Sequence, residues 1–162
     1  MPVDLYRIDD RLIHGQVVVG WGQPLHLGFI VLVDDEVAAS DWEQELYRMG
    51  CPPAIDVYFN TTEDAAANFG RYAADPRSGM ILTGDIATMA RLAERLPAIR
   101  RVNVGGVHHR PGRTQHLRYV FLTPAERDAL RALGARGVEV TAQDVPSARP
   151  VPLAELLAAG AA

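Results

Sequence analysis

The sequence contains no lysine, and all 16 of its basic residues are arginine. A Walker-A phosphate-binding loop requires a lysine, and so does an enzyme that forms a Schiff base or binds pyridoxal phosphate. None of the serines, Ser40, Ser78 and Ser147, lies in the Gly-x-Ser-x-Gly motif of a serine hydrolase. The single cysteine, Cys51, excludes an internal disulfide framework and a cysteine-based zinc site. These absences exclude several common classes of enzyme and metal site.

Long hydrophobic runs are also absent from the sequence. No apolar run approaches the roughly 18 residues that a membrane-spanning helix needs, and residues 1–4 lack the basic and apolar regions of a signal peptide. We therefore expect a cytoplasmic protein. Its 162 residues correspond to one domain, residues 1–162. The net charge of −4 argues against general nucleic-acid binding, so we expect no nucleic-acid partner.

Short apolar runs alternate along the chain with segments of helical character. We expect strands at residues 3–8, 29–33, 55–59, 80–82, 101–104, 117–122 and 138–141. We expect helices at about residues 15–22, 40–49, 61–74, 86–96, 123–134 and 153–159, the first of which ends before Pro24. This alternation predicts an α/β protein with right-handed crossovers and a mostly parallel sheet. Ligands bind beyond the carboxyl ends of the strands in such sheets, so the segments that follow the strands are the candidate sites.

The segment after the first strand, residues 7–16, combines side chains that suit phosphoryl transfer. It holds two carboxylates, Arg11 and His14 in a loop that runs into a helix. Free N–H groups at a helix start attract anions, and the glycine after His14 allows close approach to the backbone. A neutral imidazole is the required nucleophile, and Asp9 or Asp10 would hydrogen-bond one ring nitrogen and leave the other free to attack. The alternative, a loop of solvated charges with a capping aspartate, fits the same spacing.

Residues 99–118 form a second unusual segment, with five arginines, three histidines and no acidic residue. A glycine-rich loop with arginine side chains at a strand end suits an anion or an acidic partner, and the alternative is a solvated basic face. Adjacent side chains such as His108 and His109 rarely converge on one ion, so we expect no metal site there. The acidic cluster at residues 34–36 could bind Mg²⁺ with a phosphate, but we expect it to cap a helix and carry solvated charge.

Residues 7–17, Arg-Ile-Asp-Asp-Arg-Leu-Ile-His-Gly-Gln-Val, resemble the active-site signature of the IIB subunit of the mannose-type (mannose–fructose–sorbose) bacterial phosphotransferase system. This signature is highly specific. Weaker similarities to the family follow in the right order, at Trp21 and at residues 31–38, 103–106, 112–115 and 136–139. The resemblance therefore extends over nearly the whole chain.

The resemblance implies a three-layer fold, in which an open and mostly parallel sheet carries helices on both faces. It also implies that His14 accepts a phosphoryl group from a phosphohistidine on the IIA subunit. His14 would then pass this group to a sugar that the membrane subunits IIC and IID import, which makes the chain a protein-phosphohistidine–sugar phosphotransferase. We expect no cofactor and no metal, and peripheral association with the membrane through IIC and IID.

The same resemblance assigns roles to residues around the signature histidine. Arg11 would neutralise the phosphate, Asp10 would support the loop, and both are counted with the histidine as catalytic. Gly15 and Gln16 would offer backbone N–H groups to the phosphate. Arg113 stands where the family usually has lysine, which keeps a positive charge for the phosphate but changes the geometry of the donors. The segment 107–109 also departs from the family, where this stretch is more apolar.

Two functions remain compatible with the signature. The leading hypothesis is a phosphocarrier of sugar import, with a IIA subunit on another chain as the phosphoryl donor. The alternative is a regulatory or relic IIB module that is phosphorylated or docks a partner without supporting transport. A nucleotide-binding fold is disfavoured, because neither a Gly-x-Gly-x-x-Gly nor a Walker-A pattern is present. The sequence leaves open the sugar, the oligomeric state (a homo-oligomer included) and the nitrogen of His14 that carries the phosphate.

Overall fold

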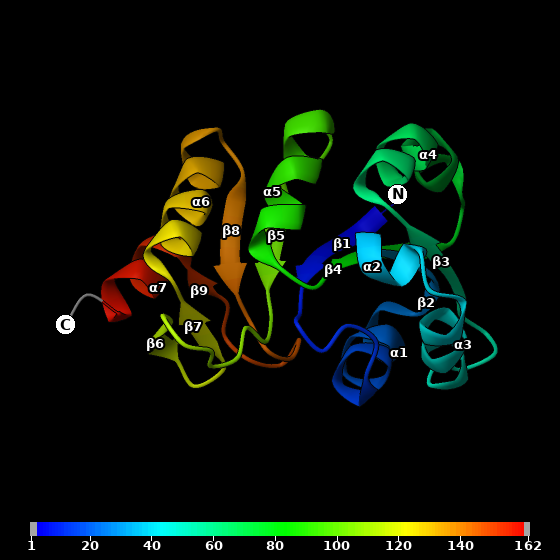
Figure 1. Ribbon diagram of the computed structural model, residues 1–162, viewed down its shortest axis with the longest axis horizontal. Helices are drawn as coiled ribbons and strands as arrows, with labels where there is room; N and C mark the ends of the chain where they lie inside the picture. Colours follow the sequence, from blue (N-terminus) through cyan, green and yellow to red (C-terminus); the bar gives the residue numbers. More distant parts are fainter. Residues whose placement is uncertain (1–2, 161–162) are drawn as a thin grey trace.

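Nine strands form two sheets within residues 3–160, the part of the chain that the computed structural model describes (Figure 1). The strands are β1 (Val3–Ile8), β2 (Leu27–Val33), β3 (Asp56–Asn60), β4 (Ser78–Thr83), β5 (Arg101–Val104), β6 (Thr114–Leu117), β7 (Val120–Leu122), β8 (Glu139–Ala142) and β9 (Val151–Pro152). The main sheet has the order β3-β2-β4-β1-β5-β8-β9, and its strands are parallel except for β9. Strands β6 and β7 form a separate antiparallel hairpin.

The helices begin mostly at polar capping residues. They are the π-helix η1 (Gln16–Trp21), α1 (Gly22–Leu25), α2 (Asp35–Ala38), α3 (Asp41–Met49), α4 (Thr62–Ala74), α5 (Ile86–Arg95), α6 (Pro124–Ala135) and α7 (Leu153–Ala159). A side-chain oxygen accepts a hydrogen bond from a first-turn N–H group at Asp34, Ser40, Thr61, Asp85 and Thr123. Such caps satisfy donors that have no partner inside the helix. The predicted capping box at Thr123 and Glu126 is confirmed.

The main sheet is covered by helices on both faces, as predicted. Strand β2 shows why, because residues 29–33 are fully buried and alternate between the two faces. Val31 packs in one core with side chains from α4, α5, α6 and α7. Ile30 packs in a second core with side chains from η1, α2 and α3. The three-layer, mostly parallel α/β fold is therefore confirmed.

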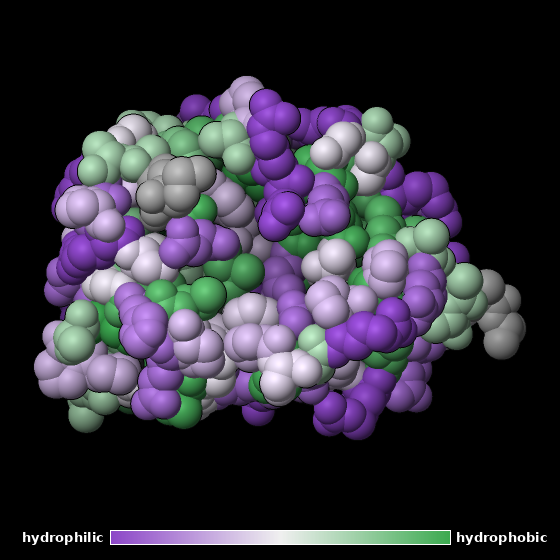
Figure 2. Space-filling model, turned by 180° about the vertical axis from the view of Figure 1, so that it is seen from behind, coloured by the Kyte–Doolittle hydropathy of each residue, from purple (hydrophilic) through white to green (hydrophobic). Residues whose placement is uncertain are grey.

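The helical layer that contains η1 does not fully cover strands β1, β5 and β8. There Trp21 from η1, Gln143 and Pro150 border a cavity of about 490 Å³, whose wall includes Asn103 and Thr141. Seen from behind, hydrophobic side chains show between hydrophilic ones near the middle of the molecule (Figure 2). Polar side chains on this half of the sheet therefore need partners from loops rather than from a covering helix.

Two sequence expectations for secondary structure are wrong. The first predicted helix does not end before Pro24, because α1 continues from η1 through Pro24 to Leu25. His26, with a left-handed φ of 51°, ends it. Proline is tolerated there because the first turn of a helix needs no N–H donor. The expected single strand over residues 117–122 is the hairpin of β6 and β7. Its two turn residues are arginine and tyrosine, which are not typical turn formers.

One short strand near the end of the described residues departs from the alternation of strands and helices. Strand β9 adds an antiparallel edge to the sheet just before α7, and the sequence analysis missed it because β9 has only two residues. No helix among residues 3–160 has the length and apolarity needed to cross a membrane.

Candidate active site

The loop that carries His14 lies where the sheet changes its direction of winding. Strands β1 and β5 are neighbours in the sheet, and the chain leaves β1 toward β2 on one side and leaves β5 toward β8 on the other. Ligands in open α/β sheets bind in the crevice at such a point. Asp10 N–H donates to the Gly106 carbonyl over 2.8 Å, and Gly105 N–H donates to the Ile8 carbonyl over 2.7 Å. These bonds hold the loops after β1 and β5 together at the carboxyl edge of the sheet.

Asp9 is the carboxylate that faces the histidine, and this answers the choice between Asp9 and Asp10. Its Oδ1 lies 3.1 Å from His14 Nε2 and also accepts a hydrogen bond of 3.2 Å from the Arg11 backbone N–H. The approach to Nε2 is off the axis of a straight hydrogen bond, so the contact is close but not well aligned. Nε2 is shielded from solvent, which leaves Nδ1 as the ring nitrogen available for attack.

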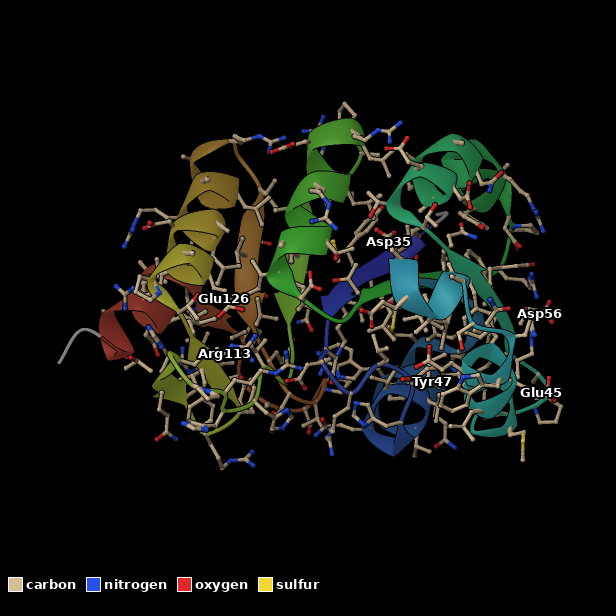
Figure 3. The ribbon with its side chains drawn as sticks, in the orientation of Figure 1. Asp35, Glu45, Tyr47, Asp56, Arg113 and Glu126 are labelled. Carbon is tan, nitrogen blue, oxygen red and sulfur yellow. The ribbon has the colours of Figure 1, made fainter. Side chains whose placement is uncertain are left out.

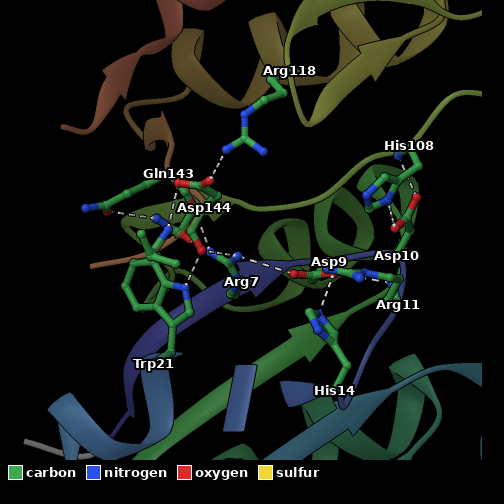
Figure 4. A network of polar contacts seen from close by, with 12 residues as sticks. Arg7, Asp9, Asp10, Arg11, His14, Trp21, His108, Arg118, Gln143 and Asp144 are labelled. Carbon is green, nitrogen blue, oxygen red and sulfur yellow. Dashed lines mark hydrogen bonds and ion pairs between the residues drawn. The ribbon is translucent and has the colours of Figure 1, made fainter. Parts of the chain in front are cut away.

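Asp9 is held in turn by Arg7, whose side chain is completely buried (Figure 4). Arg7 Nη2 lies 3.3 Å from Asp9 Oδ2 and donates to the Asp144 carbonyl over 3.1 Å. Arg7 Nη1 donates to Asn103 Oδ1 and to the Gln143 carbonyl, the latter over 2.9 Å. The guanidinium also lies over the Trp21 ring. One buried arginine thus connects the carboxylate beside His14 to residues far away in the sequence.

The electrostatic state of Asp9 follows from this pairing. Burial by itself raises the pKa of Asp9, but the contacts with His14 and Arg7 outweigh burial and keep the pKa below its ordinary value. Burial lowers the pKa of Arg7, and the neighbouring carboxylate opposes that shift. Asp9 is therefore ionised at neutral pH and presents a negative charge to the imidazole.

Three backbone N–H groups without an acceptor among the described residues stand at His14 and the two residues that follow it. Within residues 3–160, the N–H groups of His14, Gly15 and Gln16 donate to no acceptor. A Cβ atom at Gly15 would meet no atom within 4 Å, so space is open beside these donors. Leu12, with a left-handed φ of 60°, turns the chain into this arrangement. Unpaired N–H groups at the start of a helix form an anion-binding site.

Arg11 and Asp10 take different positions around this site. The Arg11 side chain is exposed, and its guanidinium donates to no protein acceptor in the described part of the chain. Asp10 accepts a 2.7 Å hydrogen bond from the His108 N–H and lies 2.7 Å from His108 Nδ1 (Figure 4). These contacts agree with a loop-supporting role for Asp10, and its assignment as a catalytic residue stays a prediction.

The folded protein supplies acidic partners to the acid-free segment 99–118. Asp10 contacts His108, and Arg118 Nη2 lies 2.7 Å from Asp144 Oδ2. Arg113 faces Glu126 with two donors, at 3.0 and 2.8 Å, and only 9% of its side chain is exposed (Figure 3). The guanidinium of Arg113 is therefore occupied, and its contact with phosphate stays a prediction. Arg110 remains exposed beside the site.

The acidic turn after β2 behaves as a capping segment. Asp34 caps α2, and Asp35 accepts a hydrogen bond of 3.2 Å from the Thr62 N–H. These residues border a polar cavity of about 380 Å³ together with Asp10 and Arg110. Among the described residues, no group of three or more His, Cys, Asp or Glu side chains is arranged to hold a metal ion. The expected capping role is confirmed.

Arg7 is the site residue whose role the sequence analysis missed. The signal was present, because a charged residue stands inside the first strand, and buried arginines are almost always paired. Its partners Gln143 and Asp144 could not be found, because they contribute backbone carbonyls rather than recognisable side chains.

Comparison with known proteins places this geometry in context. The family model for the PTS system sorbose subfamily IIB component matches residues 3–161. The chain is 34% identical over 158 residues to the N-acetylgalactosamine-specific phosphotransferase enzyme IIB component 2 of Escherichia coli (strain K12), covering 97% of this chain and 100% of that protein. It is 32% identical over 160 residues to the mannose-specific EIIAB component of the same organism, covering 97% of this chain and 49% of that protein.

The fold agrees with solved structures of the same kind. The crystal structure of the IIBSor domain of the sorbose permease from Klebsiella pneumoniae matches with a TM-score of 0.88 and 28% identity, covering 98% of this chain and 97% of that chain. The present chain spans about half the length of the mannose-specific proteins that it matches.

Proposed function

We propose that this chain, which belongs to the sorbose subfamily of PTS IIB components, carries a phosphoryl group on His14 between a IIA phosphohistidine and an imported sugar. The observation that carries the proposal is the setting of His14. Its Nε2 faces the buried Asp9 carboxylate, while Nδ1 and three unpaired N–H groups lie at the carboxyl edge of the sheet. The activity is that of a protein-phosphohistidine–sugar phosphotransferase.

The first half of the reaction loads the histidine. The Nδ1 lone pair of His14 attacks phosphorus, and the bond between phosphorus and the donor histidine breaks, its electron pair returning to the donor ring. The proton on Nε2 stays in place, so the ring gains positive charge that the Asp9 carboxylate stabilises. In the second half a sugar hydroxyl attacks the same phosphorus, the P–Nδ1 bond breaks with its electron pair returning to His14, and the hydroxyl proton passes to water.

Charge on the phosphoryl group is met by the chain itself. In the proposed reaction the unpaired N–H groups of Gly15 and Gln16 and the exposed guanidinium of Arg11 donate to the phosphoryl oxygens. Preorganised donors of this kind stabilise the equatorial oxygens of a transferring phosphoryl group without reorganisation. Arg113 would join them only after exchanging its ion pair with Glu126 for the phosphate.

The partners follow from the family. The name EIIAB of the mannose-specific relative supports a IIA donor, and we place the sugar acceptor on membrane subunits IIC and IID, with the IIB chain at their cytoplasmic side. The test uses the IIA half of that relative, phosphorylated, as the donor. We expect one acid-labile, base-stable phosphoryl group on the chain. Formation of sugar phosphate with membranes that contain IIC and IID would separate transport from a purely regulatory module.

Removing the positive charge of Arg11 should slow the loading of His14. A charge-assisted hydrogen bond to phosphate contributes roughly 1.5–3 kcal/mol, so Arg11→Gln is expected to slow acceptance by about ten- to a hundredfold. Arg11→Lys should recover only part of the rate, because the bidentate fork is lost. Single-turnover labelling from phosphorylated IIA measures both variants, with Arg131→Gln on the outer face of α6 as the matched control. An unchanged rate in Arg11→Gln would show that another residue neutralises the phosphate.

Reversing the charge of Arg110 should slow encounter with an acidic donor. Arg110 is exposed next to the site, whereas Arg113 is already paired, so Arg110→Glu tests the loop alone. Rim charges act mainly on the association rate and are screened over about 8 Å at physiological ionic strength. We expect slower second-order transfer at low salt and convergence with wild type at high salt. Arg95→Glu, at the far end of α5, makes the same charge change away from His14. Equal salt slopes for all three proteins would contradict a docking role.

A further inference from the structure

The buried Arg7 side chain has an unusually complete set of hydrogen-bond partners. Four of its five N–H donors have acceptors, which are Asp9, Asn103 and the carbonyls of Gln143 and Asp144. Resting on the proposed function, we propose that Arg7 is a positioning residue for phosphoryl transfer. It holds the Asp9 carboxylate in the orientation that keeps the proton of His14 on Nε2 and the lone pair on Nδ1.

The two oxygens of Asp9 divide their contacts. Oδ2 lies toward Arg7, at 3.3 Å from Nη2, and Oδ1 lies toward His14, at 3.1 Å from Nε2. A carboxylate that is free to rotate would exchange these oxygens or point away from the ring. Arg7 holds Oδ2 and the Arg11 backbone N–H donates to Oδ1, so the carboxylate has one orientation, in which Oδ1 is the oxygen close to Nε2. Figure 4 shows the three side chains in this sequence, from Arg7 through Asp9 to His14.

The position of the proton decides which nitrogen can react. In neutral imidazole one nitrogen carries the proton and the other holds the free lone pair. In the Nε2–H form the free lone pair is on Nδ1, the nitrogen that is not shielded. In the Nδ1–H form the lone pair would be on Nε2, which is buried against Asp9 and cannot be reached by a phosphoryl donor. Only the first form can accept the phosphoryl group on Nδ1. As the new bond forms, the bond between phosphorus and the donor histidine breaks, and its electron pair returns to the donor ring.

Arg7 itself is held by contacts that suit only a guanidinium. The carbonyls of Gln143 and Asp144 and the side chain of Asn103 surround its two terminal nitrogens, and the Trp21 indole N–H donates to the same Asp144 carbonyl over 2.9 Å. A Cβ atom on Gly105 would collide with Nη2, so a glycine at that position leaves room for the fork. A lysine has one nitrogen and cannot reach all of these acceptors together.

The test measures the proton on His14 as well as the reaction. In ¹⁵N-histidine spectra of the wild-type protein at neutral pH, we expect His14 to carry its proton on Nε2. In Arg7→Lys we expect a second population with the proton on Nδ1, and transfer from phosphorylated IIA slower by about tenfold or more. Trp21→Phe, which removes the indole donor to the Asp144 carbonyl and puts a smaller ring beneath the Arg7 guanidinium, should move both readouts in the same direction by less.

Val102→Ala is the matched control for loss of stability. Val102 is as buried as Arg7 but packs in the core on the opposite face of the sheet. It should lower the free energy of unfolding while the Nε2–H form and the transfer rate stay as in wild type. A wild-type protein in the Nδ1–H form would overturn the proposal, and so would Arg7→Lys and Trp21→Phe proteins that keep the Nε2–H form and full rate. A chain whose tautomer responds to Arg7 but takes no phosphoryl group on His14 would reject the proposed function alone.

Discussion

Replacing His14 by alanine is expected to abolish phosphoryl acceptance completely. The proposed reaction needs a nucleophilic nitrogen at the carboxyl edge of the sheet, and the proposed source is His14, whose Nε2 lies beside Asp9. Water cannot replace the nitrogen as a carrier, because a phosphoryl group attached to water is lost as free phosphate. The expected effect is therefore total loss of labelling rather than a slower rate.

The measurement is incubation with phosphorylated IIA followed by detection of the acid-labile, base-stable product. The fold should remain, since His14 lies in a loop and its ring is not part of either hydrophobic core. His109→Ala is the matched control, because His109 is exposed and its ring packs edge-on against Phe121. Labelling that persists in His14→Ala and disappears in His109→Ala would move the phosphoryl group to the loop after β5.

The second large effect is expected on stability, from Asp9→Ala. This change leaves the fully buried guanidinium of Arg7 without its carboxylate. Breaking a buried ion pair by removing one partner costs about 3–5 kcal/mol, because an uncompensated charge stays in the interior. Denaturant unfolding should show this loss, while Asp128→Ala, which breaks an exposed ion pair on α6, should cost less than about 1 kcal/mol. Similar costs for the two variants would mean that Arg7 does not need Asp9.

The same pair gives a pH dependence with a defined sign. Because the pKa of Asp9 is lower in the folded protein than in the unfolded chain, its contribution to stability is fully present above about pH 4. The contribution is lost as the pH falls through the folded pKa, where the carboxylate takes up a proton. The difference in unfolding free energy between wild type and Asp9→Ala should therefore shrink in acid and stay constant near neutral pH.

The elements that could be predicted from sequence are those that local chemistry decides. Strand β2 is a continuous apolar run, and α6 begins at a capping box, so both are encoded within a few residues. The hairpin of β6 and β7 could not be predicted, because Arg118 and Tyr119 form its turn without glycine, asparagine or proline. Local preference was outweighed there by pairing and packing.

The candidate nucleophile could be proposed from the sequence, whereas most of its surroundings could not. His14 stands out because its signature is contiguous in the sequence. The Asp9 side chain points toward His14 and the Asp10 side chain points toward His108. The spacing of the residues in the sequence does not decide these directions. The acidic partners of residues 99–118 could not be predicted, for a different reason. These acids, among them Glu126 and Asp144, lie outside the segment and approach it only in the folded chain.

The contacts of Arg7 have a consequence for protein synthesis. Arg7 is joined to the carbonyls of Gln143 and Asp144, which lie 136 and 137 residues further along the chain. A ribosome releases the signature before these carbonyls, and contacts of such long sequence separation form late. A nascent or truncated chain that ends before residue 143 therefore carries the histidine without the support that orients it. If Arg7 positions the site as proposed, such incomplete polypeptides are expected to accept phosphoryl groups more slowly than the finished chain.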